Sequence, residues 1–194
     1  MILTGLLGLV CALVYGSFLE WFIHRFVMHS DRISKLAFQR HAISHHSTRR
    51  SLRNFYIPPE EEFHYSIGES SFVPILWFIH LPMYIVVGYY FTLSPAIGLG
   101  IGGLLYLLAY EILHFYIHAP RNYRFQRTRL FRFYCEYHRL HHHKARINYN
   151  VVCPLADFTL RTISLDTLRV EPSAPEFVSP DTGPRAVFRR QPRI

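Results

Sequence analysis

The stretch Tyr137-His138-Arg139-Leu140-His141-His142 places three imidazoles within five residues of sequence. If this stretch is helical, positions i, i+3 and i+4 share one face, so His138, His141 and His142 can converge on a common point. Imidazole is the commonest protein ligand of metal ions. The stretch therefore predicts a helix that contributes three ligands to a metal site.

Three further histidine clusters precede this stretch along the chain. His24 and His29 lie about 140° apart around a helix, so they either flank a helix end or bind different ions. In the next cluster His41 and His45 are one helical turn apart, while His46 points in a neighbouring direction. One ion accepts roughly four to six ligands, so the clustered imidazoles imply two ions. The predicted metal ligands are His24, His29, His41, His45, His46, His114, His118, His138, His141 and His142.

Composition restricts the kind of protein that carries these clusters. Of the 194 residues 50% are hydrophobic, yet the formal net charge is +8. All 21 Lys and Arg residues lie between positions 25 and 53 or from 121 onward, so charged and apolar segments are separated. Basic residues mark the cytoplasmic side of short membrane loops. The charge therefore fits a membrane protein, and no motif that reads nucleic acid accompanies it.

Two apolar runs predict the architecture. Residues 2–22 carry a single charge, at Glu20, and suffice for one membrane crossing. Residues 72–112 suffice for two crossings with a turn near Thr92-Leu93-Ser94-Pro95, and Gly98 and Gly102 allow close helix approach in the second. We expect an all-α integral membrane helical bundle of about three spans, with a cytoplasmic helical cap that carries a histidine-rich dimetal site. Residues 1–170 would form this membrane domain and the proline-rich residues 171–194 a disordered tail.

Three carboxylates lie where they can support the ligands. A metal-bound imidazole commonly donates its second N–H to a carboxylate. Glu20 precedes His24 by four residues, and Glu111 precedes His114 by three. Asp157 is a candidate for the same role beside the C-terminal cluster. Each carboxylate also fits a plain helix-end or interfacial charge.

The four clusters, in this order, resemble those of the fatty acid hydroxylase superfamily of histidine-rich membrane diiron oxygenases, and most closely those of the fatty acid 2-hydroxylases. The resemblance covers about residues 20–165 and rests on the combination of clusters rather than on any single one. The matching stretches are Glu20 to His29, His41 to His46 with Ile57-Pro58-Pro59, Tyr110 to His118 and Tyr137 to His142, with a weaker match from Asn148 to Asp157.

This resemblance implies that the ten clustered histidines hold two iron ions, which activate dioxygen and insert one oxygen atom into a fatty acyl C–H bond. It implies no catalytic residue beyond these ligands. Zinc can occupy the sites of a purified sample, because it binds imidazole more tightly than ferrous iron does. Relatives often carry a fused cytochrome b5 domain that this chain does not resemble, so we expect a separate cytochrome b5-like or ferredoxin-like electron donor. The substrate would be a lipid whose acyl chain enters between the spans from the bilayer.

The sequence leaves other functions and two locations open. Carotenoid or sterol hydroxylases and desaturases of the same superfamily carry similar clusters, and an oxygen atom in the product separates hydroxylation from desaturation. A membrane metal transporter or haem carrier is the alternative from another class, but it requires ligands deep in the membrane, where only His80 lies. We expect the clusters at the cytoplasmic face of a bacterial inner membrane, with the endoplasmic reticulum as the alternative.

Overall fold

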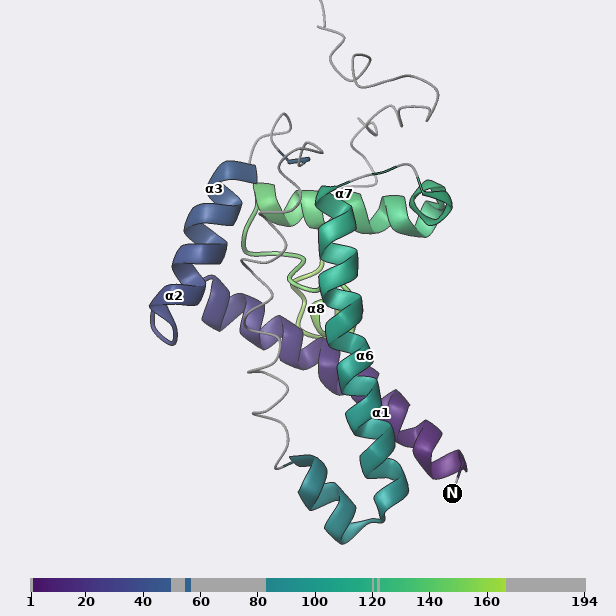
Figure 1. Cartoon of the computed structure of the whole chain (residues 1–194). Helices are drawn as coiled ribbons and strands as arrows, with labels where there is room; N and C mark the ends of the chain where they lie inside the picture. Colours follow the sequence, from purple (N-terminus) through teal and green to yellow (C-terminus); the bar gives the residue numbers. More distant parts are fainter. Residues whose placement is uncertain (1, 50–54, 57–82, 120, 122, 167–194) are drawn as a thin grey trace, which may run out of the picture.

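The computed structural model describes residues 2–49, 55–56, 83–119, 121 and 123–166 (Figure 1). Within these residues every regular element is a helix, which confirms the all-α class. Residues 83–90 are helical and precede the second long helix. The other elements are α1 (Ile2–Phe22), η1 (Ile23–Met28), α2 (Lys35–Phe38), η2 (Gln39–His45), α3 (His46–Arg49), α6 (Leu93–His118), η4 (Arg124–Arg127), α7 (Arg129–His143) and α8 (Leu155–Thr159).

Two helices are long and apolar enough to cross a membrane. Residues Ile2–Met28 have a mean hydropathy of 2.2 over their most apolar window, and Leu93–His118 have 1.8. The turn before α6 lies where it was predicted. The third predicted span requires residues 72–82, which lie outside the described residues, as do Ile57-Pro58-Pro59, His80 and the predicted tail. The third span and the tail therefore stay predictions.

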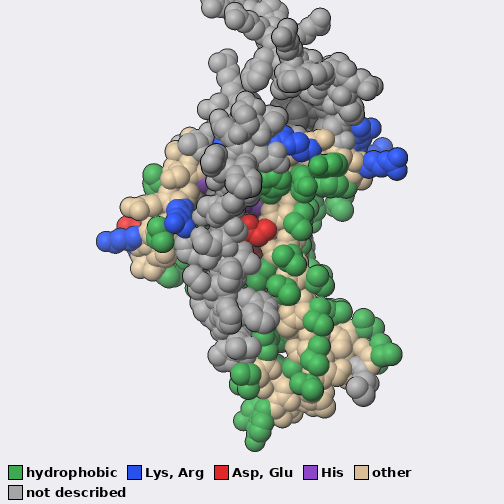
Figure 2. All heavy atoms as spheres, viewed as in Figure 1, with side chains coloured by type: hydrophobic (Ala, Val, Ile, Leu, Met, Phe, Trp, Pro, Cys, Tyr) green, Lys and Arg blue, Asp and Glu red, His purple; other side chains and the backbone are tan. Residues whose placement is uncertain are grey.

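The outer faces of these helices suit lipid. Large hydrophobic side chains such as Leu7 on α1 and Leu105 on α6 are exposed, and Figure 2 shows them along the length of α6. Lys and Arg side chains lie instead around α2 and α7, which adjoin the C-terminal ends of α1 and α6 (Figures 1 and 2). An apolar surface of this extent is stable in contact with acyl chains rather than water.

Glycines bring α1 and α6 into close contact. A Cβ atom added at Gly98 would collide with the backbone carbonyl of Gly5, and one added at Gly102 would lie 2.5 Å from Cβ of Ala12. The predicted role of Gly98 and Gly102 as a close-approach face is therefore confirmed. Since only glycine fits at these positions, the two helices cross at a fixed point.

The cap is built on the adjoining ends of these helices. Helix α7 lies across the end of α6 (Figure 1), and the Thr128 side chain caps its first turn by accepting a hydrogen bond from Phe131 N at 3.2 Å. The loop before α8 is tied to α1 through Ser17, whose hydroxyl donates to the Cys153 carbonyl at 2.7 Å and accepts from Ala156 N at 2.9 Å. These ties fix the C-terminal segment against α1, beside the histidine clusters.

Candidate metal centre

The ten predicted ligands form two compact groups. Within each group the nearest ligand atoms all lie within 4.8 Å of one another. Two of the chain's other histidines, His64 and His80, lie outside the described residues, and His143 is exposed on α7. We call the first set metal group 1: His24, His29, His41, His46 and His141. We call the second set metal group 2: His45, His114, His118, His138 and His142.

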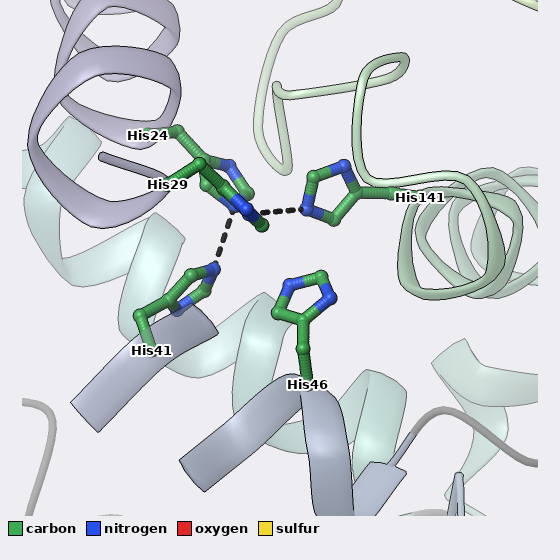
Figure 3. A group of neighbouring side chains, drawn as sticks. All are labelled: His24, His29, His41, His46 and His141. Carbon is green, nitrogen blue, oxygen red and sulfur yellow. Dashed lines mark hydrogen bonds between the residues drawn. The ribbon is translucent and has the colours of Figure 1, made fainter. Parts of the chain in front are cut away.

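Two π-helical segments build metal group 1. Backbone hydrogen bonds of the i to i+5 type join His29 N to His24 O, across η1, and His46 N to His41 O, at the end of η2. The wider turn of a π-helix brings residues five apart onto one side, where an α-helix separates them. Figure 3 shows the rings of these four residues pointing toward the same centre as His141, which comes from α7.

This geometry decides one open question and corrects one grouping. Of the two alternatives for His24 and His29, it favours the one in which both flank a helix end, since they lie in one group at the two ends of η1. His41 and His45, predicted to act together one turn apart, lie in different groups, and His46 joins His41. The α-helical period of 3.6 residues gave the wrong partners because the segment is π-helical.

Helix α7 serves both groups. The predicted helix over residues 137–142 is confirmed, but its three histidines do not converge on one point. His138 and His142 are one turn apart and enter metal group 2, while His141 lies about 100° away from His142 around the helix and enters metal group 1. The helix therefore lies along the boundary between the groups.

Metal group 2 joins three elements. His45 comes from η2, His114 and His118 come from the last turns of α6, and α7 supplies the remaining two. The groups are direct neighbours, since the rings of His46 and His142 stack with centroids 4.0 Å apart. The sequence prediction of two adjacent ion sites therefore has a matching geometry.

Backbone carbonyls orient several of the rings. Nδ1 of His118 donates to the Phe55 carbonyl at 2.8 Å, and Nδ1 of His141 donates to the Ile147 carbonyl at 2.7 Å. His24 Nδ1 donates to the Tyr149 carbonyl in the same way. A ring that donates from Nδ1 keeps the lone pair on Nε2, which is the arrangement that a metal ligand requires.

The Nε2 atoms face one another at the distances expected around a single ion. With metal–nitrogen bonds of about 2.0–2.1 Å, two neighbouring ligand nitrogens lie roughly 2.8–3.4 Å apart. Both ring nitrogens of buried His46, by contrast, have no hydrogen-bond partner among the described residues. Each group therefore fits a metal ion. The facing Nε2 atoms are 2.8–3.1 Å apart in the pairs His24–His41, His29–His141, His118–His138 and His138–His142.

Burial favours the neutral form of seven of these imidazoles. It lowers the pKa of His29 from 6.5 to about 4. At neutral pH the His29 ring is therefore without the extra proton that would prevent it from binding a metal. Burial, followed by the neighbouring imidazoles, lowers the pKa of His41, His45, His46, His138, His141 and His142 in the same direction.

Glu20 makes no hydrogen bond to the histidine predicted as its partner. Buried Glu20 accepts hydrogen bonds from Tyr106 OH at 2.6 Å, from Asn150 Nδ2 at 3.2 Å and from Val151 N, and none of its hydrogen bonds in the described part of the chain comes from His24. Its role is to tie α1 to α6 and to the loop before α8. Glu111 is half-buried on α6. The prediction that Glu20 bonds directly to a ligand was wrong because its partners are distant in sequence.

Asp157 supports the ligands indirectly, through the backbone of the loop before α8. Its carboxylate accepts from Tyr149 N at 3.0 Å, from Asn150 N at 2.7 Å and from Tyr137 OH at 2.8 Å, not from an imidazole of the C-terminal cluster. It thereby holds the residue whose carbonyl accepts from His24. Sequence reasoning missed the carbonyls of Phe55, Ile147 and Tyr149, since every residue has a carbonyl and no side-chain pattern marks these three.

Comparison with known protein families agrees with this geometry. The family model described as fatty acid hydroxylase matches residues 9–162, which is most of the chain and includes all ten clustered histidines. The chain belongs to the fatty acid hydroxylase family. The sequence-based recognition is therefore confirmed, and membership indicates a membrane oxygenase rich in histidine. No curated protein and no solved structure gives a significant match to this fatty acid hydroxylase family member.

Proposed function

We propose that this chain is a membrane-bound diiron oxygenase that hydroxylates the acyl chain of a lipid, with dioxygen as the oxidant and electrons from a separate donor. One observation carries the proposal: two groups of five imidazoles lie side by side at the ends of two long apolar helices. Neither carboxylates nor thiolates join these groups among the described residues. Imidazole suits iron as a ligand.

Bound iron would supply the redox chemistry that no side chain can perform, since an alkyl C–H bond offers no acid, base or leaving group. The protein contributes position and environment. Metal group 1 would be held by η1, the η2–α3 segment and α7, and metal group 2 by η2, α6 and α7. The carbonyls of Tyr149, Phe55 and Ile147 fix the tautomers of three ligands, so that Nε2 faces the ion.

The apolar faces of α1 and α6 support a lipid substrate. An acyl chain can lie against their exposed side chains within the bilayer while its polar end remains at the interface, close to the metal groups. We infer that the groups face the cytoplasm, because the basic residues gather at the same end of the molecule. A bacterial inner membrane is the proposed location, and a cytochrome b5-like or ferredoxin-like protein is the proposed donor.

The test is lipid mass spectrometry on cells that express the chain under ¹⁸O₂. The comparison uses unmodified protein, His141→Ala in metal group 1, His138→Ala in metal group 2, and His143→Ala as the matched control. His143 is exposed on the same helix and lies in neither group. We expect an acyl product with one ¹⁸O atom from the unmodified chain and from His143→Ala, and none from the two ligand variants.

Other products would replace this proposal. Loss of two hydrogens without oxygen would indicate a desaturase, and a labelled carotenoid or sterol would indicate a different substrate class within the family. If membrane-inserted, metal-loaded protein supplied with a reductant changes no lipid, acyl hydroxylation is refuted.

A further inference from the structure

Helix η4 and the start of α7 form one side of the cap, beside the end of α6 (Figure 1). Fully buried Gln126 fixes this arrangement. Its side-chain oxygen accepts from Arg121 N at 2.8 Å and from Tyr123 N at 3.1 Å. Its amide nitrogen donates to the carbonyl of Tyr116, in the last turns of α6, at 3.3 Å. The segment therefore has a defined position against the end of a candidate membrane span.

This segment carries exposed apolar side chains. The rings of Tyr123 and Phe125 stack with centroids 6.0 Å apart, and they lie 5.6 and 5.3 Å from the ring of Tyr116. Even so, Tyr123 is 50% exposed, Phe125 is 42% exposed and Leu130 is 66% exposed. We call these three side chains the apolar patch of η4. Through Tyr116 the patch continues the apolar surface of α6, and Figure 2 shows hydrophobic side chains both there and at this end of α7.

Arginines accompany the apolar patch. Residues 119–135 contain five arginines and neither Asp nor Glu. Arg124 and Arg129 are exposed, and neither forms an ion pair within the described part of the chain. Like charges this close in the sequence repel one another, so nearby anions would stabilise them. The five residues are Arg121, Arg124, Arg127, Arg129 and Arg132.

The orientation of α7 suits a membrane surface. The helix lies across the end of α6, so it runs along the surface of a membrane that α6 crosses (Figure 1). Aromatic rings are enriched at the level of the lipid head groups, and arginine can place its stem on apolar groups and its charge among phosphates. An acidic soluble protein would neutralise the arginines, but it would not account for the continuity of the patch with the lipid-facing surface of α6. A membrane surface matches both features.

We propose that η4 and the first turn of α7 bind the surface of an anionic membrane. Arg124 and Arg129 bind phospholipid phosphates, and the apolar patch of η4 enters the boundary between head groups and acyl chains. This lipid is a constituent of the bilayer and not a substrate, since none of these residues belongs to a metal group. The contact holds α7, which supplies ligands to both groups, at the level of the head groups. The inference goes beyond the proposed function and does not depend on it.

The first experiment measures lipid selectivity. Metal-loaded full-length protein in neutral detergent is titrated with phosphatidylglycerol and with phosphatidylcholine, which has a phosphate but no net charge. The double variant Arg124→Gln with Arg129→Gln is compared with Lys144→Gln with Arg146→Gln. This matched control also removes two exposed positive charges, at the other end of α7. Metal content is measured for each variant, so that a folding defect is recognised.

We expect the Arg124 and Arg129 double variant to bind phosphatidylglycerol roughly 10- to 30-fold more weakly than the unmodified protein, because each arginine at an anionic surface contributes roughly fivefold to affinity. The control should change this affinity by less than about threefold. Binding of phosphatidylcholine should change by less than about twofold in both variants.

The second experiment measures depth in the bilayer. Leu130→Trp is reconstituted in nanodiscs that contain phosphatidylglycerol, and brominated phospholipids quench the fluorescence of tryptophans that they touch. The matched control is Ala145→Trp, an exposed position after the other end of α7. We expect the tryptophan added at position 130 to lose a larger fraction of its fluorescence than the one added at position 145.

Equal losses of phosphatidylglycerol affinity in the two double variants, or equal quenching of the two added tryptophans, would overturn the inference. An acidic soluble protein of the cytochrome b5 type is the third probe. If it binds the unmodified protein and loses that binding in the Arg124 and Arg129 variant, while phosphatidylglycerol is not preferred, the surface docks a protein and the membrane contact is refuted. No turnover is measured, so these outcomes are separate from the test of the oxygenase.

Discussion

Substitution of Asp157 by asparagine tests whether the loop before α8 positions the metal ligands. The carboxylate is completely buried, and each of its oxygens accepts two hydrogen bonds. One oxygen faces Tyr149 N at 3.0 Å and the other faces Asn150 N at 2.7 Å. Whichever way the new amide turns, its NH₂ group faces one of these backbone N–H donors, which is left without an acceptor.

The expected loss of stability follows from these contacts. A buried donor without a partner costs about 1–3 kcal/mol, and the remaining bonds lose the contribution of the negative charge. We expect Asp157→Asn to lower the free energy of unfolding by about 2–4 kcal/mol. For a chain of this size that corresponds to a decrease in Tm of roughly 5–15 °C.

The assay compares Asp157→Asn with Asp166→Asn in thermal unfolding of detergent-solubilised protein, with metal content measured in parallel. Asp166 makes an exposed ion pair with Lys144 at 3.7 Å, and its side chain is 61% exposed, so the same chemical change there should cost less than about 1 kcal/mol. Asp157→Asn should also lose metal, because the Tyr149 carbonyl that holds His24 moves with the loop. A decrease in Tm no larger than that of the control would refute the reasoning.

Three other predictions follow from the helix contact, the buried imidazoles and the two groups. Gly98→Ala should destabilise the protein by about 1–3 kcal/mol, because the added Cβ would meet the α1 backbone. Gly100→Ala is the control: the nearest atom to its Cβ lies at 4.0 Å, so Tm should stay unchanged or rise slightly. Equal decreases in Tm for the two variants would contradict the packing. Metal-free protein should lose stability as the pH falls from 6.5 to about 4, because in that range the unfolded chain binds a proton at His29 and the folded protein does not. A Tm that stays constant between pH 7.5 and 4.5 would argue against a buried neutral imidazole at this position. His46→Ala and His138→Ala alter different groups, so each variant should retain about one metal equivalent by elemental analysis, and the double variant should retain none. Loss of both ions from either single variant would show that the groups are not separate.

Local sequence patterns were sufficient to predict the two long apolar helices. The apolar run of residues 2–22 predicted α1, and the polar break near Thr92 predicted the start of α6. Gly98 and Gly102 were identified because they lie four residues apart on one face of the helix, and the contact with α1 confirms that interpretation. These features depend on residues close together in the sequence, where chain geometry is known in advance.

The ligand set was predicted as a whole, but its division into two groups was not. The division depends on a change from α- to π-helical hydrogen bonding within η1 and η2, which brings His29 onto the side of His24 and His46 onto the side of His41. No residue type favours a π-turn by itself, because its cost is offset by contacts made elsewhere in the fold. Pairing by α-helical spacing therefore failed for these histidines.

The hydrogen-bond partners of the buried carboxylates also could not be predicted from spacing along the sequence. Glu20 was identified because it precedes His24 by four residues, and Asp157 as a candidate partner of the C-terminal cluster, but neither carboxylate bonds to an imidazole among the described residues. In the structure Glu20 bonds to Tyr106 and to Asn150, which are 86 and 130 residues away. Sequence proximity identifies partners within one helix, whereas the partners of a buried charge are set by packing between helices.

The sharing of elements between the groups explains why this distant network matters for the metal centre. The η2–α3 segment supplies His41 and His46 to metal group 1 and His45 to metal group 2, and α7 also contributes to both. Because the two groups are built on the same two segments, a shift of either segment changes both groups at once and alters the separation between them. The bond from Tyr137 to Asp157 fixes one of these segments, α7, relative to α1 through the loop that Glu20 holds. The buried acids therefore act on the placement of both metal groups, through the helix and the loop that carry their ligands.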